Sequence, residues 1–377
     1  MKGFSALAMR HRPLGSLLSR SVQRCDLLLI IPTGLVLAFG LLGLYSVNPA
    51  LARAQVLFAL FGGLGFVLVS ILSYRRLKTA ALPVFLISSV LLLGVLFLGK
   101  EVGGASRWFA IGPLFFSPSE FAKVALIVVV SSLLSSSPSL GVRGFLISIV
   151  PVAILSVMAV LQPSLGTALV FCVVWAGIIW AAGVPIRYLF TCLVLIGVSL
   201  PLVWGGLEGY QRARITAFLN PMSDPLGSGY NVIQSVIAVG SGQLLGKGLG
   251  MGTQSRLQFL PVRYTDFIFA SLTEEWGLLG AGLLLALFGI LLWRILKITS
   301  FCRDRFGFLL GSGVFTLFFA QVVINVGMNI GAAPITGLSL PLVSYGGSSL
   351  LFTLAALGLV HSLAIHRDGQ SFGVPRS

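Results

Sequence analysis

Long apolar runs separated by short polar segments cover almost the whole chain. Each run is long enough to cross the ~30 Å hydrocarbon core of a bilayer as a helix. The runs predict ten transmembrane helices near residues 27–47, 54–73, 80–99, 118–136, 143–161, 163–183, 187–205, 266–296, 307–331 and 347–365. We therefore expect an all-α polytopic integral membrane protein.

Composition and charge agree with this class and set the expected orientation. Of the residues, 56% are hydrophobic and only 9% are charged, which excludes an ordinary soluble domain. The net charge of +15 does not indicate nucleic acid binding, because Lys and Arg lie between apolar runs rather than on one polar surface. With ten spans, 16 of the 25 basic residues lie on the same side of the membrane as the N-terminus. The positive-inside rule therefore predicts that both ends are cytoplasmic.

The expected organisation is a single membrane domain over 27–366, with a basic cytoplasmic tail over 1–26 and a second tail over 367–377. Residues 206–265 form a large extracytoplasmic loop between helices 7 and 8. A loop of that length in a compact protein is usually functional. Within it, Tyr230–Leu245 is typical of a short amphipathic helix at the interface, and a glycine-rich run follows. Cleavage of the first apolar run as a signal peptide is the alternative for the N-terminus.

Asp266 is the first candidate for chemistry. It ends the long external loop, which also supplies several cations that could bind a phosphorylated substrate: Arg212, Arg214, Lys247, Arg256 and Arg263. A carboxylate among such cations could accept a proton from a substrate hydroxyl. The alternative is a helix N-terminal acid favoured by the dipole, with Thr265 as the N-cap.

A second candidate site lies around the fourth apolar run. Glu120 and Lys123 are three residues apart and could form an ion pair that shapes a cavity. Glu120 could instead complete a capping box with Ser117. Arg107 and Trp108 precede this run in an external segment, although the tryptophan could be only an interfacial anchor.

Two further acids, Glu274 and Glu275, lie inside the eighth apolar run. Helical geometry prevents both from facing the cavity that Asp266 would face. We expect them to pair with polar groups of neighbouring helices.

Taken together, these residues resemble the SEDS family (shape, elongation, division, sporulation), which includes RodA, FtsW and SpoVE. The resemblance covers nearly the whole chain and is strongest over Ser106–Lys123, Gly229–Ala270 and Asn325–Leu350. Within the family, the stretches Gly252–Ser255 (GTQS) and Asn325–Met328 (NVGM) are more similar to RodA than to FtsW.

The resemblance implies a peptidoglycan glycosyltransferase that joins lipid II units, with inversion, on the outer face of the bacterial cytoplasmic membrane. It implies a class B penicillin-binding protein and other elongation-machine membrane proteins as partners, and a role in cell elongation and shape. Asp266 matches the family's essential aspartate. The positions that match its cavity are Arg107, Trp108, Glu120 and Lys123. Further cations for substrate binding are Arg212, Arg214, Lys247 and Arg263.

The resemblance is incomplete at one position. The family's usual Gln-Pro-Asp-Leu-Gly is Gln162–Gly166 here, with Ser164 in place of the acid. No cofactor is implied with certainty, and a divalent cation (Mg or Mn) stays open. An FtsW-like division role, a lipid II flippase and a non-catalytic scaffold are the alternative functions.

Overall fold

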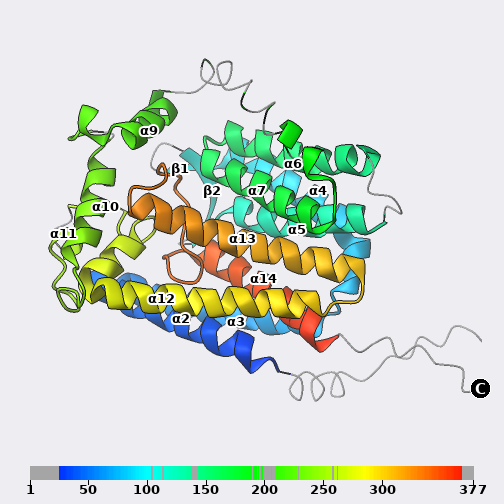
Figure 1. The fold of residues 1–377 in the computed structure, drawn as a ribbon, viewed down its shortest axis with the longest axis horizontal. Helices are drawn as coiled ribbons and strands as arrows, with labels where there is room; N and C mark the ends of the chain where they lie inside the picture. Colours follow the sequence, from blue (N-terminus) through cyan, green and yellow to red (C-terminus); the bar gives the residue numbers. More distant parts are fainter. Residues whose placement is uncertain are drawn as a thin grey trace, which may run out of the picture.

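The structure is a computed structural model that describes residues 25–366, except for 103–104, 113, 137–141, 189, 193, 195–196, 198–204, 206–208, 228, 257–258 and 261. Its helices lie side by side along the long axis of the molecule (Figure 1). Residues 1–24 of the predicted N-terminal tail, the predicted C-terminal tail and most of the predicted seventh span, 187–205, lie outside the described residues.

Eight helices in the described part of the chain are long and apolar enough to span a membrane, which confirms the predicted fold class. They are α2 (Leu27–Val47), α3 (Pro49–Ile71), α4 (Arg75–Leu98), α5 (Pro118–Ser136), α6 (Val142–Leu161), α12 (Ile268–Ser300), α13 (Arg305–Asn329) and α14 (Gly347–Ile365). A shorter apolar helix, α7 (Leu165–Ala181), occupies the predicted sixth run.

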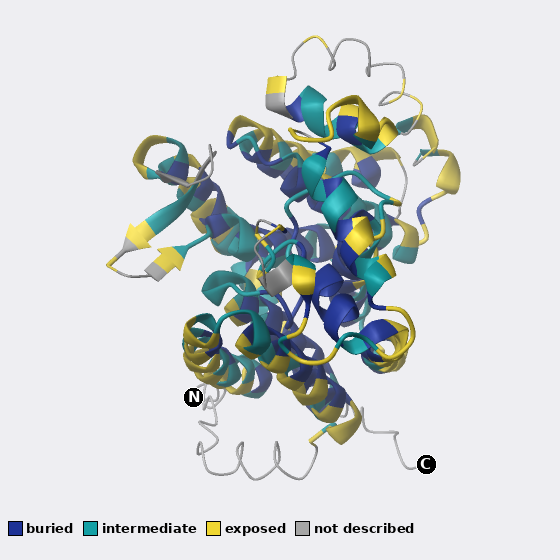
Figure 2. Cartoon of the chain, turned by 90° about the vertical axis from the view of Figure 1, so that its left-hand side faces the viewer, coloured by how far each residue is buried: buried dark blue, intermediate teal, exposed yellow. Residues whose placement is uncertain are grey.

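The exposed surface of the bundle is apolar. Side chains such as Leu60, Phe97 and Val90 are 66%, 84% and 66% exposed. Figure 2, which looks at the end of the bundle, shows exposed positions on the outer faces of the helices and buried positions between them. Buried polar residues such as Gln55 and Asn325 lie inside instead. This distribution is the one expected of a protein whose solvent is lipid.

One segment departs from the all-helical expectation. Between α4 and α5 the chain forms a small antiparallel sheet of β1 (Lys100–Val102), β2 (Ala105–Ile111) and β3 (Leu114–Phe116), in that order. Periodicity did not reveal it, because β1 and β3 have only three residues each, too few to show a pattern.

The long loop gathers at one end of the bundle (Figure 1). It contains α9 (Gly209–Leu219), the 3-10 turn η1 (Pro221–Ser223), α10 (Tyr230–Ser241) and α11 (Thr253–Arg256). The predicted amphipathic helix is confirmed as α10, although it ends four residues earlier than expected. It buries Val232, Ser235 and Ala238, and it packs against α12.

Helix α12 is interrupted at Gly277, whose φ of 68° and ψ of −168° are not helical. The segment after α10 fills this break. Leu278 and Leu279 donate their backbone N–H groups to the carbonyls of Gln243 and Leu244, at 2.8 and 3.1 Å. The N–H groups of Lys247 and Gly248 in turn donate to the carbonyls of Glu274 and Glu275, each at 3.0 Å. The backbone groups freed by the break are thereby paired within the protein.

We predict that Gly277→Ala destabilises the protein by about 1–3 kcal/mol, because its φ suits glycine and an added Cβ would lie 2.3 Å from the Gly246 nitrogen. Gly282→Ala in the same helix is the control, since a Cβ there has nothing within 4 Å. Thermal unfolding of the purified variants measures both. Equal melting temperatures would show that the break is not held by this contact.

Candidate active site

Asp266 lies in the turn just before α12, and its backbone is held by another helix. Its carbonyl accepts hydrogen bonds from the side-chain amides of Asn325 and Asn329 on α13, each at 3.0 Å. The Oδ1 atom of Asn329 accepts from the N–H of Ala270, also at 3.0 Å. Both asparagines are fully buried. The start of α12 is therefore fixed by α13.

This arrangement corrects the expected cap. Thr265 is not the N-cap of α12, because the helix begins at Ile268 and Phe267 occupies the cap position without a side-chain hydrogen bond. Asn329 supplies a cap acceptor from a neighbouring helix instead. The sequence contained a signal for this contact, since two amides four residues apart in an apolar run lie on one helix face and need partners.

Asp266 is brought together with Arg214 and the loop between α13 and α14. A Cβ built on Gly337 would lie 3.7 Å from Asp266 Oδ2 and 3.8 Å from Arg214 Nη1. Asn325 also donates to the carbonyl of Leu338, at 2.7 Å. One side chain therefore ties the Asp266 turn to the loop that carries Gly337. Neither Asn325 nor Gly337 was among the predicted site residues.

Burial and nearby charges act in opposite directions on the carboxyl of Asp266. Burial away from water raises the pKa of its carboxyl above the ordinary value. A hydrogen bond with Thr265 and the charges of Arg214 and Arg107 act in the opposite direction and hold the increase of this pKa down. The two arginines that affect Asp266 come from α9 and β2, far apart in sequence.

Arg107 is held by the turn between α6 and α7. Its Nε donates to the carbonyl of Gln162 at 3.1 Å, and its Nη2 donates to the carbonyl of Pro163. The next residue, Ser164, precedes α7, and its hydroxyl pairs with the Thr167 hydroxyl at 2.8 Å. The segment with serine in place of the family's usual acid is therefore part of the Arg107 environment.

Trp108 follows Arg107 on β2 and pairs with Lys100 across the sheet. The pairing is irregular at Arg107, because Ser106 and Trp108 pair with the consecutive residues Glu101 and Lys100, so Arg107 is the extra residue of a β-bulge. Trp108 is half-buried.

Glu120 and Lys123 form the predicted ion pair at the start of α5, with 2.7 Å between Oε1 and Nζ. The Lys123 side chain is 2% exposed and that of Glu120 is 16% exposed. The capping box is not formed, because the N–H of Ser117 donates to the hydroxyl of Ser348 at 3.0 Å. The carboxylate of Glu120 is thus committed to the lysine.

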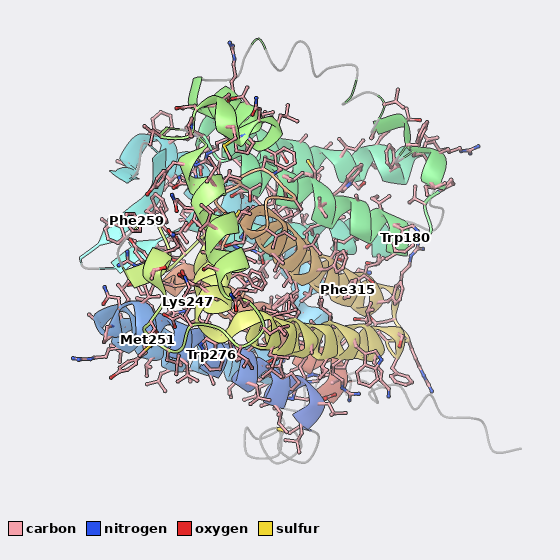
Figure 3. The ribbon with its side chains drawn as sticks, turned by 60° about the vertical axis from the view of Figure 1, so that its left-hand side comes forward. Trp180, Lys247, Met251, Phe259, Trp276 and Phe315 are labelled. Carbon is pink, nitrogen blue, oxygen red and sulfur yellow. The ribbon has the colours of Figure 1, made fainter. Side chains whose placement is uncertain are left out.

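Lys247 of the long loop is paired with an acid other than Asp266. Lys247 donates to Glu274 Oε1 at 2.8 Å, and Thr253 and the N–H of Gln254 donate to the same oxygen. Figure 3 shows Lys247 and Met251 at the end of the bundle, with Trp276 below them. Lys247 therefore holds the loop against the broken helix.

The remaining predicted acid and cations have separate surroundings. Glu275 accepts from the hydroxyl of Ser46 on α2 at 2.7 Å, a contact with a neighbouring helix as expected. Arg212 donates to the carbonyl of Gly205 at 2.9 Å. Arg263 is half-buried close before Asp266. Among the described residues there is no group of three or more His, Cys, Asp or Glu side chains that could hold a metal ion.

Comparison with known proteins identifies the family of this chain. Residues 23–369 match the model of the FtsW, RodA and SpoVE family of cell cycle proteins. The chain is 41% identical to the peptidoglycan glycosyltransferase MrdB of Escherichia coli K12, over 77% of this chain and 79% of that protein. It is 38% identical to the stage V sporulation protein E of Bacillus subtilis, over 89% and 95% of the two chains.

Two solved structures share the fold. A chain from a peptidoglycan synthase complex that coordinates polymerization and crosslinking is 36% identical, with a TM-score of 0.79 over 91% of this chain and 98% of that one. The rod shape determining protein RodA of Thermus thermophilus is 31% identical, with a TM-score of 0.71 over 92% and 98% of the chains. The chain belongs to the FtsW, RodA and SpoVE family, as the resemblance of its motifs implied.

Proposed function

We propose that this chain polymerises lipid II into glycan strands on the outer face of the cytoplasmic membrane, with Asp266 as the general base. The observation that supports this most directly is a buried carboxylate whose backbone is held by two asparagines and whose charge interacts with two guanidinium groups, those of Arg107 and Arg214. Relatives with the same fold are named peptidoglycan glycosyltransferases. The proposal includes cytoplasmic ends, which place Asp266 outside.

The proposed reaction is an inverting glycosyl transfer. A sugar hydroxyl attacks the anomeric carbon of a second lipid II, the bond from that carbon to the undecaprenyl pyrophosphate breaks, and Asp266 takes the hydroxyl proton. A positioned general base contributes ~10²- to 10⁴-fold. Pyrophosphate leaves without a proton if cations stabilise its negative charge. Arg107 and Arg214 are the closest candidates for this role.

The other predicted residues receive more specific roles. Arg212 and Arg263 extend the cationic surface for the second pyrophosphate, and Trp108 anchors the sheet at the interface. We assign Lys247 a structural role in holding the long loop against α12, because its charge is paired with Glu274. We assign Glu120 and Lys123 to the cavity wall, because the lysine is almost fully buried.

A class B penicillin-binding protein is the proposed partner. The support is the similarity to a chain from a synthase complex that both polymerises and crosslinks. A RodA-like role in elongation is proposed from the stretches GTQS and NVGM. FtsW proteins of other bacteria are also similar, at 33% to 41% identity, so a division role is the second candidate.

Asp266→Asn is expected to lower the polymerisation rate by ~10²-fold or more, because an amide cannot accept the proton. The variant should stay folded, since the backbone contacts of Asp266 do not use its side chain. Gel analysis of glycan chains made from lipid II by the purified protein with its partner measures the effect.

Asp224→Asn, in the long loop before Asp266, is the matched control and should retain normal activity. Normal chain synthesis by Asp266→Asn would disprove the assignment, and lipid II transfer between leaflets without lengthening would favour the flippase.

The pH dependence of kcat/KM tests the role of Arg214. Activity requires ionised Asp266, so it rises as the pH increases through the pKa of this group, which burial has raised. Arg214 lowers this pKa, so Arg214→Gln should move the acidic limb of the profile of kcat/KM against pH to higher pH. Arg212→Gln, two residues away on α9, should leave the position of the limb unchanged. A limb that stays in place, or moves to lower pH, in Arg214→Gln would contradict the assignment.

Lys123→Met should destabilise the protein by about 3–5 kcal/mol, because it leaves the Glu120 carboxylate without its ion-pair partner. Adding Glu120→Gln removes that charge and should recover both the melting temperature and lipid II turnover. Thermal unfolding and steady-state kinetics measure the two properties. A stable double variant with a raised KM for lipid II would show that the pair contacts the substrate instead.

A further inference from the structure

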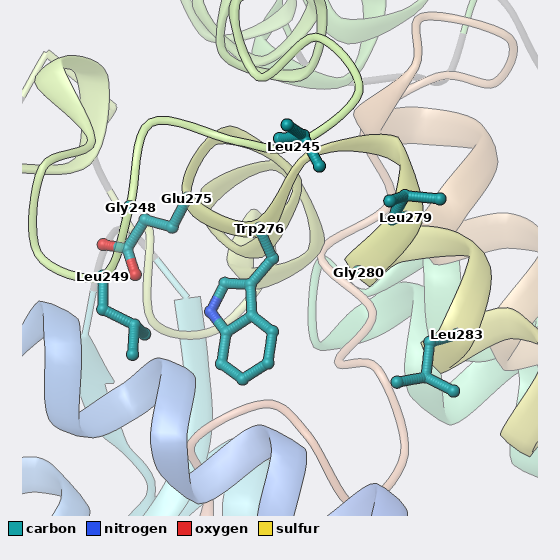
Figure 4. A pocket seen from close by; sticks show the side chains of 8 residues that line it. All are labelled: Leu245, Gly248, Leu249, Glu275, Trp276, Leu279, Gly280 and Leu283. Carbon is teal, nitrogen blue, oxygen red and sulfur yellow. The ribbon is translucent and has the colours of Figure 1, made fainter.

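A pocket of about 400 Å³ lies beside the break in α12. Figure 4 shows its lining, which comes from α12 on one side and the segment after α10 on the other. The lining residues are Leu245, Gly248, Leu249, Glu275, Trp276, Leu279, Gly280 and Leu283. We call it the lateral pocket. None of the residues to which we assign lipid II binding or catalysis lines it.

Two polar atoms of the lateral pocket lack partners. Glu275 is 4% exposed, and its Oε2 is buried without a hydrogen bond. The indole Nε1 of Trp276 is also buried and unpaired. In Figure 4 the carboxylate and the indole nitrogen lie on the Leu249 side of the helix. Leaving a buried donor or acceptor unpaired costs about 1–3 kcal/mol, and more for a charged group, so a ligand that pairs both atoms would gain that energy.

The mouth of the lateral pocket faces lipid. Leu245, Leu249, Leu279 and Leu283 are 78%, 58%, 62% and 53% exposed. Exposed leucines on a spanning helix and its adjoining loop contact acyl chains. Glu275 is seven residues after Ile268, so the pocket lies at the Asp266 end of α12, about 10 Å from the start of the helix. A ligand would therefore enter from the leaflet on that side.

The charge of the lateral pocket indicates a cationic ligand. Glu274 is neutralised by Lys247. The adjacent Glu275 accepts a hydrogen bond from the neutral hydroxyl of Ser46 on Oε1, and its carboxylate also has a hydrogen bond with the backbone of Gly250. These groups carry no charge. An N⁺–H donor to the unpaired Oε2 would form a charge-assisted hydrogen bond, roughly twice as strong as a neutral one.

We propose that the lateral pocket binds a phospholipid with a primary ammonium headgroup, such as phosphatidylethanolamine. The ammonium donates to Glu275 Oε2, and the Trp276 indole donates to a phosphate or ester oxygen of the same lipid. The acyl chains lie along the exposed leucines. A lipid bound there would contact both α12 and the segment after α10, and would stabilise the packing of this segment against the broken helix.

Native mass spectrometry of the detergent-purified full chain tests this directly. Dioleoyl phosphatidylethanolamine is compared with dioleoyl phosphatidylcholine, which has the same net charge but no N–H on its headgroup. We expect the wild type to bind the ethanolamine lipid about tenfold more tightly, the value of one charge-assisted hydrogen bond. Glu275→Gln, which keeps the shape, should lose this preference.

A second pair of variants tests the proposal even if Glu275→Gln does not fold. Leu279→Trp fills the lateral pocket, whereas Leu278→Trp adds the same ring at an adjacent exposed position outside its lining. Only Leu279→Trp should abolish the preference. Equal binding of the two lipids to the wild type, or equal loss in both variants, would overturn the proposal. A basic side chain of a partner's membrane helix would then be the better occupant. The readout is independent of polymerisation, so it does not depend on the role of Asp266.

Discussion

Every backbone N–H and C=O group inside a bilayer must find a partner within the protein, and this constraint shapes the functional end of the molecule. Where α12 is broken at Gly277, four backbone hydrogen bonds from the segment after α10 replace the missing helical ones. Where α12 begins, Asn325 and Asn329 of α13 bond to the backbone around Asp266. Both irregularities are therefore rigid features.

This rigidity has a direct chemical use. A general base is effective only if it is held at hydrogen-bonding distance from the proton that it takes. A side-chain cap on Thr265 would have fixed the helix start by local contacts alone. The asparagines instead fix it relative to α13 and, through Leu338, to the loop next to Asp266 and Arg214. The site is thus assembled from β2, α9, the turn before α12, helix α13 and the loop that follows α13.

Buried charges must also be paired within the protein, because burying an unpaired charge costs free energy. Buried or half-buried acids are neutralised by specific cations: Asp26 by Arg294, Glu120 by Lys123 and Glu274 by Lys247. These pairs join distant segments or fix a helix start, so their charge is used for architecture. Asp266 differs, because burial raises the pKa of its carboxyl while Arg214 and Arg107 limit the increase. Glu275 differs as well, since one of its oxygens is left unpaired beside a lipid-facing pocket.

The sequence alone locates the spanning helices of the described residues, because the length of an apolar run reflects the thickness of the hydrocarbon and does not depend on neighbouring segments. The runs at 27–47, 118–136 and 347–365 coincide with α2, α5 and α14. It also determined the Glu120–Lys123 pair, since residues three apart on a helix are adjacent. Which distant residues meet is set by how the helices pack. The hold of Asn325 and Asn329 on Asp266 and the pairing of Lys247 with Glu274 depend on contacts between segments far apart in sequence. Local periodicity cannot encode such contacts, because they arise when helices pack and each buried polar group takes the nearest available partner.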